Sequence, residues 1–238
     1  MPLSPQRRML LGFVLANGCI ALVAVLLWSW RPTPPPLIQG VLLPEARPLE
    51  AFTLLDCQGR EVGRESLQGH WTLVTYGFTT CPDVCPATLA DLMQFRQRLP
   101  ADYAHDLEIL FYSVDYRRDS PERLRSYLGF FASDLRGLTA SPTHVTGQQA
   151  FERSLGILAQ LEPGDSGDLS TGDYQVLHGV SLLLLNPRGE LQALLEPDPA
   201  GAGLPTFNIN TLVQDYLALR DYFDQTTLAH ATTRPRPG

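Results

Sequence analysis

The stretch HWTLVTYGFTTCPDVCPATLADL, residues 70–92, joins an apolar run to two cysteines and then to a helical pattern. Residues 70–78 are apolar and rich in β-branched and aromatic side chains, which predicts a buried strand. After the cysteines, apolar residues recur at the spacing of one broad helical face: Leu89, Leu92, Met93, Phe95 and Leu99. The stretch therefore predicts a strand, a loop that carries thiols and a helix, in that order.

Each of the two cysteines, Cys81 and Cys85, is followed directly by a proline, which restricts how the helix can begin. Proline is tolerated in the first helical turn and disrupts the interior, so Pro82 and Pro86 cannot both lie deep in one helix. The simplest solution starts the helix at Pro86, with Cys85 near its N-cap and outside the α region, and Cys81 in the preceding loop. Both sulfurs then lie at a helix N-terminus, where free amides and the helix dipole favour the thiolate.

Two thiols this close in sequence allow three interpretations. A structural disulfide would close a very short loop and so would stabilise the fold only a little. In an oxidising compartment, a close pair can instead cycle between dithiol and disulfide. Two thiolates are also soft ligands that suit copper(I) or zinc, and an imidazole would complete a three-coordinate copper site.

Among the five histidines, His178 is the best candidate for that imidazole. It stands in DYQVLHGVSLLLL, just before the most apolar strand of the chain, and Gly179 allows close approach of the backbone. In an α/β sheet, a loop beside a buried central strand can come near the helix that carries the cysteines. For the other four histidines we expect solvated or locally bonded side chains: His70, His105, His144 and His230.

Residues 9–30 contain no formally charged side chain and would span about 33 Å as a helix, enough to cross a bilayer core. Arginines precede this run, Trp28 and Trp30 end it, and the positive-inside tendency places residues 1–8 in the cytoplasm. The short N-terminal region lacks the character of a transit peptide, so we expect a single-pass protein of the bacterial inner membrane with its domain in the periplasm. A cleaved signal peptide is the alternative, although the run is longer than a typical signal core.

The rest of the chain divides by composition. Residues 31–48 hold six prolines and predict a semi-extended spacer, and residues 226–238 predict a disordered tail. Within residues 49–225, strands alternate with helices before a hairpin around the turn NPRG and a final helix, which predicts an α/β fold with a mixed sheet flanked by helices. This order resembles a thioredoxin-like fold. Strands are predicted at 51–56, 70–78, 107–115 and on both sides of 186–189, and helices after the cysteines and at 119–131, 147–157 and 208–223.

Composition excludes several kinds of function. A net charge of −7 argues against nucleic-acid binding, since phosphate contacts need a basic face. The chain has no lysine, which removes Schiff-base chemistry and lysine-dependent phosphate loops. Cys57 has no obvious partner and is expected to be inert. Asp83 is either a solvated turn residue or a group that tunes thiol acidity or contacts a partner, and Asp115 and Asp119 are candidates for the rim of the site.

Three segments, in this order behind one apolar N-terminal run, resemble the SCO/SenC proteins: YGFTTCPDVCPATLADL (76–92), VDYRRDSPERLRSY (114–127) and DYQVLHGVSLLLLNPRGE (173–190). The likeness covers roughly residues 48–224. It implies a thioredoxin-like domain that binds one copper ion through Cys81, Cys85 and His178. It also implies a partner, cytochrome c oxidase subunit II, whose dinuclear copper site would receive the copper or have its cysteines reduced.

One position departs from the resemblance. The family commonly has aspartate immediately before the histidine, where this chain has Leu177, whereas Asp173 and Tyr174 keep the upstream part of the pattern. Leu177 cannot supply a polar group to orient the imidazole of His178, as an aspartate at this position could.

Several functions therefore compete. The first is a membrane-anchored copper metallochaperone, which needs no enzymatic activity. The second is a thiol-disulfide oxidoreductase with Cys81 and Cys85 as its redox pair, although the spacing differs from the CxxC of redox proteins. A peroxidase is suggested only by FTTCP and is disfavoured by the second cysteine four residues on. A copper or redox sensor would use the same site with another partner.

Overall fold

The computed structural model describes residues 5–29, 34–165, 167–198, 203 and 205–233, and within these it leaves out the side chains of residues 7, 8, 10, 11, 26–29 and 226–233. The chain divides into two units, one comprising Met1–Pro35 with Tyr222–Gly238 and the other Pro36–Asp221. The first unit contains α1 (Pro5–Ser29). Among the described residues, no helix combines the length and the apolar character that a membrane span requires. The predicted anchor, residues 9–30, extends over positions outside that description.

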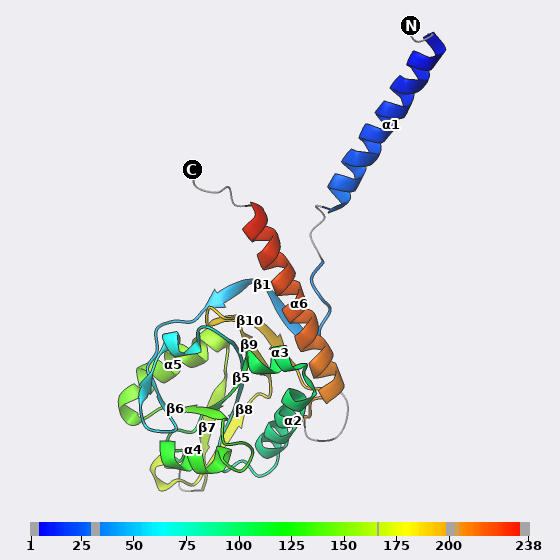
Figure 1. The fold of residues 1–238 in the computed structure, drawn as a ribbon. Helices are drawn as coiled ribbons and strands as arrows, with labels where there is room; N and C mark the ends of the chain where they lie inside the picture. The colour runs from blue at the N-terminus through cyan, green and yellow to red at the C-terminus, as the bar shows by residue number, and fades with distance from the viewer. Residues whose placement is uncertain (1–4, 30–33, 166, 199–202, 204, 234–238) are drawn as a thin grey trace. The chain divides into compact units, whose positions relative to one another are not determined.

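The second unit is built on an eight-stranded mixed sheet in the order β1-β10-β9-β4-β5-β6-β2-β3 (Figure 1). The central strands β4, β5 and β6 run parallel, and every other neighbouring pair in the sheet is antiparallel. The strands are β1 (Gly40–Pro48), β2 (Leu54–Asp56), β3 (Glu61–Val62), β4 (Trp71–Gly77), β5 (Leu107–Ser113), β6 (Arg136–Thr139), β9 (Leu182–Leu185) and β10 (Glu190–Leu195). A separate antiparallel pair comprises β7 (Ala159–Pro163) and β8 (Tyr174–His178).

Helices cover both faces of this sheet. Successive side chains of the buried strand β5 point to opposite faces, so neighbouring residues of β5 contact different helices. Tyr112 meets Phe151 of α5 on one face, with ring centroids 4.9 Å apart. Phe111 meets Tyr127 of α4 on the other, at 5.8 Å. The helices are α2 (Val84–Arg98), α3 (Ala101–His105), α4 (Pro121–Leu128), α5 (Val145–Leu155) and α6 (Ile209–Thr233), with single turns at Arg64–Leu67, Pro142–His144 and Leu169–Thr171.

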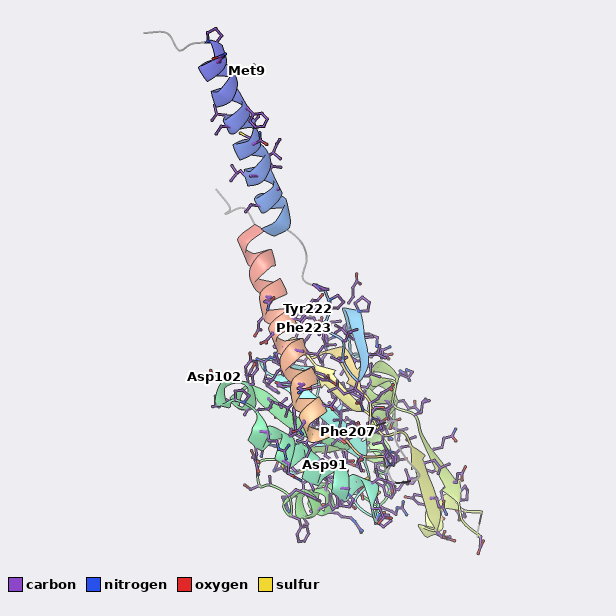
Figure 2. All side chains as sticks on the ribbon, turned by 90° about the vertical axis from the view of Figure 1, so that its right-hand side faces the viewer. Met9, Asp91, Asp102, Phe207, Tyr222 and Phe223 are labelled. Atoms are coloured by element: carbon purple, nitrogen blue, oxygen red, sulfur yellow. The ribbon has the colours of Figure 1, made fainter. Side chains whose placement is uncertain are left out.

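The helix that carries Cys85, α2, packs against the C-terminal part of the domain. Phe95 packs edge to face on Tyr216 of α6, with centroids 5.6 Å apart. Asp91 accepts a hydrogen bond from the backbone of Phe207, just before α6, and both residues can be located in Figure 2. Leu92 lies between these contacts and is fully buried. The N-terminal turn of α2 is therefore presented by a rigidly packed helix.

The predicted spacer at residues 31–48 is wrong at its C-terminal end. Residues 40–48 form β1, which pairs with β10 as an edge strand of the sheet. Pro44 falls inside the irregular stretch of this pairing, between Leu42 and Arg47, where no ladder hydrogen bond is needed from its nitrogen. An edge strand can contain prolines at positions that need no ladder hydrogen bond. The proline-rich composition of residues 31–48 therefore did not indicate that a strand is present.

The predicted disordered tail is also shorter than expected, since α6 continues to Thr233. No glycine or proline interrupts residues 209–233, so nothing in the backbone ends the helix earlier. Residues 234–238 lie outside the described part of the chain. The other predicted strands and helices are confirmed with shifted ends, and the N-cap of α4 is Ser120, whose hydroxyl accepts a hydrogen bond from the Arg123 amide at 3.3 Å.

Truncating the core of α2 tests this packing. We expect Leu92→Ala to lower the free energy of unfolding by about 2–5 kcal/mol, because it opens a cavity in a fully buried site. Gln94→Ala, on the exposed face of the same helix, should change it by less than about 0.5 kcal/mol. Chemical denaturation of both variants measures the difference. If both substitutions lowered the free energy of unfolding equally, the buried face of α2 would not be the one that stabilises the packing of this helix.

Candidate functional site

The pairing of β4 with β9 brings the two halves of the candidate site to one edge of the sheet. These strands are antiparallel, with Val74 opposite Leu183 and Thr72 opposite Leu185. The end of β4 therefore lies beside the beginning of β9. The cysteine loop leaves the end of β4, and the chain that follows His178 enters β9, so segments about a hundred residues apart in sequence converge here.

Cys85 lies inside the first turn of α2 rather than at its N-cap. The helix begins at Val84 with Asp83 as its N-cap residue, so the predicted start at Pro86 is two residues late. Pro86 is accommodated because the amides of a first turn have no intrahelical partner anyway, and this outweighs its tendency to push Cys85 out of the α region. Cys81 lies in the loop, as predicted. The exposed Asp83 makes no side-chain cap, which fits the solvated-turn interpretation.

The two thiols are close together and both are free. The amide of Cys85 donates a hydrogen bond to the sulfur of Cys81, with N and Sγ 3.4 Å apart. Cys85 is 4% exposed and Cys81 is half-buried. Burial raises the pKa of the Cys85 thiol, and the charges of Cys81 and Asp119 add to this, against the opposing effect of a hydrogen bond from the Phe78 backbone. The expectation of a thiolate at both positions is therefore wrong for Cys85, because desolvation outweighs the helix N-terminus.

Glycine is required beneath the Cys85 sulfur. A β-carbon at position 77, the last residue of β4, would lie 2.5 Å from Cys85 Sγ and 3.5 Å from Cζ of Phe111. No side chain fits at that distance without moving the sulfur. Gly77 thus allows the first turn of α2 to pack directly against the end of β4.

His178 is the last residue of β8, paired across the small sheet with Ala159. Its ring packs edge-on against Tyr76 and Phe78, each with a centroid separation of 5.7 Å. Nδ1 lies 2.7 Å from the carbonyl oxygen of Gly179, and since a carbonyl can only accept, Nδ1 carries the proton and donates. Burial lowers the pKa of His178, partly opposed by this bond. The imidazole is thus neutral, with the lone pair of Nε2 free to bind a metal.

A small cavity of about 10 Å³ joins the two halves of the site. This is on the order of one water molecule, so the cavity suits an ion rather than an organic substrate. Its lining comes from β4, α2, β5 and the segment after β8: Thr75, Tyr76, Val84, Cys85, Thr88, Phe111, His178, Val180 and Ser181. Within the described residues, however, no three histidine, cysteine or acidic side chains are grouped closely enough to hold a metal ion. The structure places Cys81 next to Cys85, and Cys85 and His178 line the same cavity. The three side chains are not grouped closely enough to form a three-ligand metal site.

His178 also borders a wider, open groove of about 480 Å³. The groove runs along β7, and its rim includes Leu158, 81% exposed, and Leu177, 45% exposed. The histidine can therefore be approached from solvent through this groove.

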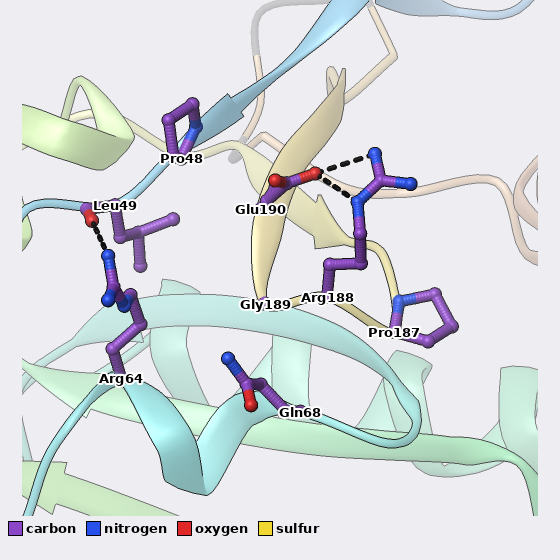
Figure 3. Close-up of a pocket in the computed structure, with 8 residues that line it drawn as sticks. All are labelled: Pro48, Leu49, Arg64, Gln68, Pro187, Arg188, Gly189 and Glu190. Atoms are coloured by element: carbon purple, nitrogen blue, oxygen red, sulfur yellow. Dashed lines mark hydrogen bonds and ion pairs between the residues drawn. The ribbon is translucent and has the colours of Figure 1, made fainter.

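Another cavity, of about 390 Å³, lies at the opposite end of β4, between the end of β1 and the β9–β10 turn (Figure 3). Its lining contains no cysteine or histidine. Both of its arginines are already engaged, Arg64 with the Leu49 carbonyl at 3.3 Å and Arg188 with Glu190 at 2.7 Å. This cavity offers no ligands for a soft metal.

Asp119, expected at the rim, is instead fully buried and fastens the cysteine loop. Its carboxylate accepts hydrogen bonds from the amide of Thr79 at 2.8 Å, the hydroxyl of Thr79 at 2.5 Å and the hydroxyl of Ser113 at 2.6 Å. Thr79 stands two residues before Cys81, so Asp119 ties the loop to β5. Burial raises the pKa of Asp119, and the hydrogen bonds from Ser113 and Thr79 oppose this. Nothing in the sequence distinguished this aspartate from a solvated one.

Asp115 is also buried and fastens the strand that carries the histidine. It accepts a hydrogen bond from the hydroxyl of Tyr174 at 2.6 Å and pairs with Arg118, whose guanidinium lies 4.0 Å from the centre of the Tyr174 ring. Tyr174 begins β8 and His178 ends it. Asp115 and Arg118 therefore hold the first residue of the strand whose last residue is His178.

The remaining candidates play no part in this site. His70 pairs with Glu108 and His144 with Glu61, each at 3.1 Å, and His105 is exposed at the end of α3. Cys57 is buried and donates to the carbonyl of Gly137 at 3.7 Å, in agreement with the inert interpretation. The side chain of His230 lies outside the described residues.

Asp119 gives the domain a pH dependence opposite to that of an ordinary paired carboxylate. Because its folded pKa is raised above an unfolded value of about 3.9, the folded state holds the proton more tightly, and this stabilisation is lost as pH rises through the folded pKa. We expect the free energy of unfolding of the wild type, relative to Asp119→Asn, to increase as pH is lowered from 7 towards 4. The slope should not exceed about 1.4 kcal/mol per pH unit, the limit for one proton.

Denaturation at a series of pH values measures this difference. Asn resembles the neutral acid, since it can donate to Thr79 as the protonated carboxyl would. A difference that shrinks on acidification would show that the carboxylate form is the stable one in the folded protein.

The comparisons with known proteins agree with this architecture. The SCO1/SenC family profile matches residues 43–203. A protein of Stutzerimonas stutzeri is 31% identical over 169 residues, which cover 69% of this chain and 79% of that protein. Mitochondrial relatives, such as the SCO2 homolog of Homo sapiens, are matched over about half of their own length.

Solved structures show the same fold. The apo Sco1 protein of Thermus thermophilus is 31% identical with a TM-score of 0.62, covering 77% of this chain and 97% of that one. Copper-bound ScoI of Arabidopsis thaliana is 26% identical with a TM-score of 0.59, covering 74% of this chain and 99% of that one. The domain thus has the thioredoxin-like α/β fold expected from the order of its elements, and this chain belongs to the SCO1/SenC family.

Proposed function

We propose that this chain is a metallochaperone that binds one copper ion through Cys81, Cys85 and His178. The observation that carries the proposal is the ion-sized cavity shared by Cys85 and His178, with the Cys81 sulfur in contact with the Cys85 amide. In the same family, ScoI of Arabidopsis thaliana has been solved with copper bound. The partner we propose is the dinuclear copper site of cytochrome c oxidase subunit II.

The donor set fits a soft ion. Two sulfurs and a neutral imidazole nitrogen are ligands that copper(I) prefers, and the free lone pair of His178 is Nε2 because Nδ1 is held by Gly179. Cys85 keeps its proton in the metal-free protein, since burial raises its pKa. Metal binding must therefore displace that proton, which makes the affinity depend on pH.

The unequal exposure of the ligands suits transfer by ligand exchange. Cys81 is half-buried in a loop, whereas Cys85 is buried in the first turn of α2. An incoming cysteine or histidine of the target can replace Cys81 first, while Cys85 and His178 still hold the copper. The open groove beside His178 then gives the target access to the second exchange.

Copper titration of purified protein tests the ligand set. We expect the double variant Cys81→Ser/Cys85→Ser to lose specific copper(I) binding. His178→Ala should weaken binding by more than the roughly 10–100-fold that loss of an outer-shell partner costs. His144→Ala, which removes a histidine already paired with Glu61, is the control and should bind as the wild type does. An unchanged affinity in His178→Ala would remove the histidine from the site.

A second candidate function, reduction of a disulfide in the target, is favoured by the closeness of the two free thiols. In that reaction Cys81 and Cys85 lose two electrons and two protons to form a disulfide, and the target's disulfide becomes a dithiol. The same His178→Ala variant separates the two functions, because reduction has no need of an imidazole. Its thiol–disulfide potential should match that of the wild type while its copper affinity falls.

We also propose that residues 9–30 anchor the chain in a bacterial inner membrane with the domain in the periplasm, on the evidence of their uncharged composition. In cell fractionation, the full chain should remain in the membrane pellet after an alkaline carbonate wash. A chain that lacks residues 1–30, exported by a cleavable signal, should be released as soluble protein. Full extraction of the intact chain by carbonate would rule out a spanning anchor.

A further inference from the structure

One aromatic residue, Phe78, contacts both halves of the candidate site. It lies in the loop between β4 and α2, and its carbonyl oxygen accepts a hydrogen bond from the amide of Cys81 at 3.2 Å. Its ring packs edge-on against the imidazole of His178, with centroids 5.7 Å apart and the two planes at 87°. Phe78 therefore contacts the cysteine loop through its backbone and the histidine through its side chain.

The backbone on both sides of Phe78 is fixed. Gly77 ends β4, and its carbonyl oxygen accepts a hydrogen bond from the amide of Val114 at 2.9 Å. Thr79 is bonded to the buried Asp119 through both its amide, at 2.8 Å, and its hydroxyl, at 2.5 Å. Because both neighbours are held in this way, the side chain of Phe78 leaves the backbone at a defined place.

A guanidinium also contacts the Phe78 ring. Cζ of Arg118 lies 5.8 Å from the centroid of this ring and 4.0 Å from that of the Tyr174 ring, both within the range of cation–π interactions. Arg118 is itself held, because it pairs with the buried Asp115 and donates a hydrogen bond to the carbonyl of Tyr174 at 3.2 Å. The Phe78 ring is thus in contact with a fixed cation as well as with His178.

His178 depends on such contacts because it borders two different spaces. It lines the ion-sized cavity that it shares with Cys85, and it also lines the open groove of about 480 Å³. The hydrogen bond of its Nδ1 is made to Gly179, the adjacent residue, so it does not tie the ring to another element. Tyr76 and Phe78 supply ring contacts from outside its own strand.

We propose that Phe78 is a positioning residue that holds the imidazole of His178 beside the cysteine loop and so favours copper binding. The inference rests on the proposed function. Without the Phe78 ring, the imidazole can turn from the cavity towards the groove, and only molecules with the ring at the cavity can use it as a ligand. The apparent Kd for copper rises as the fraction of such molecules falls.

Phe78→Leu tests this, because it removes the ring and keeps an apolar side chain. We expect its Kd for copper(I), measured by competition with a chromophoric chelator, to rise by about threefold to tenfold. This is the range that the loss of one edge-on ring pair predicts. Phe78→Tyr keeps a ring at the position and should bind copper(I) as the wild type does.

Phe131→Leu is the matched control. Phe131 is half-buried, as Phe78 is, and its ring packs edge-on against Tyr127 with centroids 5.5 Å apart. Its replacement removes a ring contact of the same kind without touching either half of the candidate site. The Kd of Phe131→Leu for copper(I) should therefore equal that of the wild type.

A double-variant cycle shows whether Phe78 acts through the histidine. If it does, Phe78→Leu/His178→Ala should bind copper(I) with the same Kd as His178→Ala alone, because the imidazole that Phe78 positions is already absent. An effect on the cysteine loop or on the whole fold would weaken binding again in the double variant and would overturn the inference.

Nuclear Overhauser effects in the metal-free wild type give a second measurement that needs no variant. The imidazole protons of His178 should show cross-peaks to the ring protons of Phe78, since the two rings are in contact. Their absence would overturn the inference even if Phe78→Leu proved too unstable to titrate.

The outcomes separate the two proposals. If the wild type binds copper(I) no better than Cys81→Ser/Cys85→Ser, the proposed function fails and this inference falls with it. If the wild type binds copper(I) and Phe78→Leu has the same Kd, the inference alone is overturned. It is also overturned if Phe131→Leu weakens binding as much as Phe78→Leu does, since the effect would then not be specific to the ring beside His178.

Discussion

The antiparallel pairing of β4 with β9 is the contact on which the candidate site depends. Val74 and Leu183 lie opposite each other in the middle of the sheet, both buried, and their register decides which ends of the two strands meet. All four residues of β9, Leu182–Leu185, are buried, so both faces of this strand pack into the core. The core therefore holds β9 beside β4, and the register of this pair brings His178 to the loop of Cys81 and Cys85.

Burial and the polarity of the helix N-terminus have opposite effects on the pKa of Cys85 at this edge of the sheet. The N-terminus of α2 favours a thiolate, but Cys85 rests on Gly77 with 4% of its surface exposed, and desolvation prevails. The same burial keeps His178 neutral. Two sulfurs and a neutral imidazole form a donor set that suits an ion able to form strong bonds to sulfur.

Polar groups beneath the surface hold these donors in place. Asp119 fastens the loop through Thr79, and Asp115 fastens β8 through Tyr174. Both aspartates come from the segment between β5 and α4, so one short stretch positions both halves of the site.

Local patterns determined much of this protein. The apolar run at 70–78, the two Cys-Pro pairs and the helical face after them predicted the strand, loop and helix in order, because these signals act over only a few residues. The hairpin around NPRG followed in the same way. Only the tertiary structure decided the rest. The edge strand β1 lies in a proline-rich stretch and exists because β10 offers it a partner. The protonation of Cys85 and the role of Asp119 depend on burial and on neighbours distant in sequence, and the spacing of residues along a chain does not encode these.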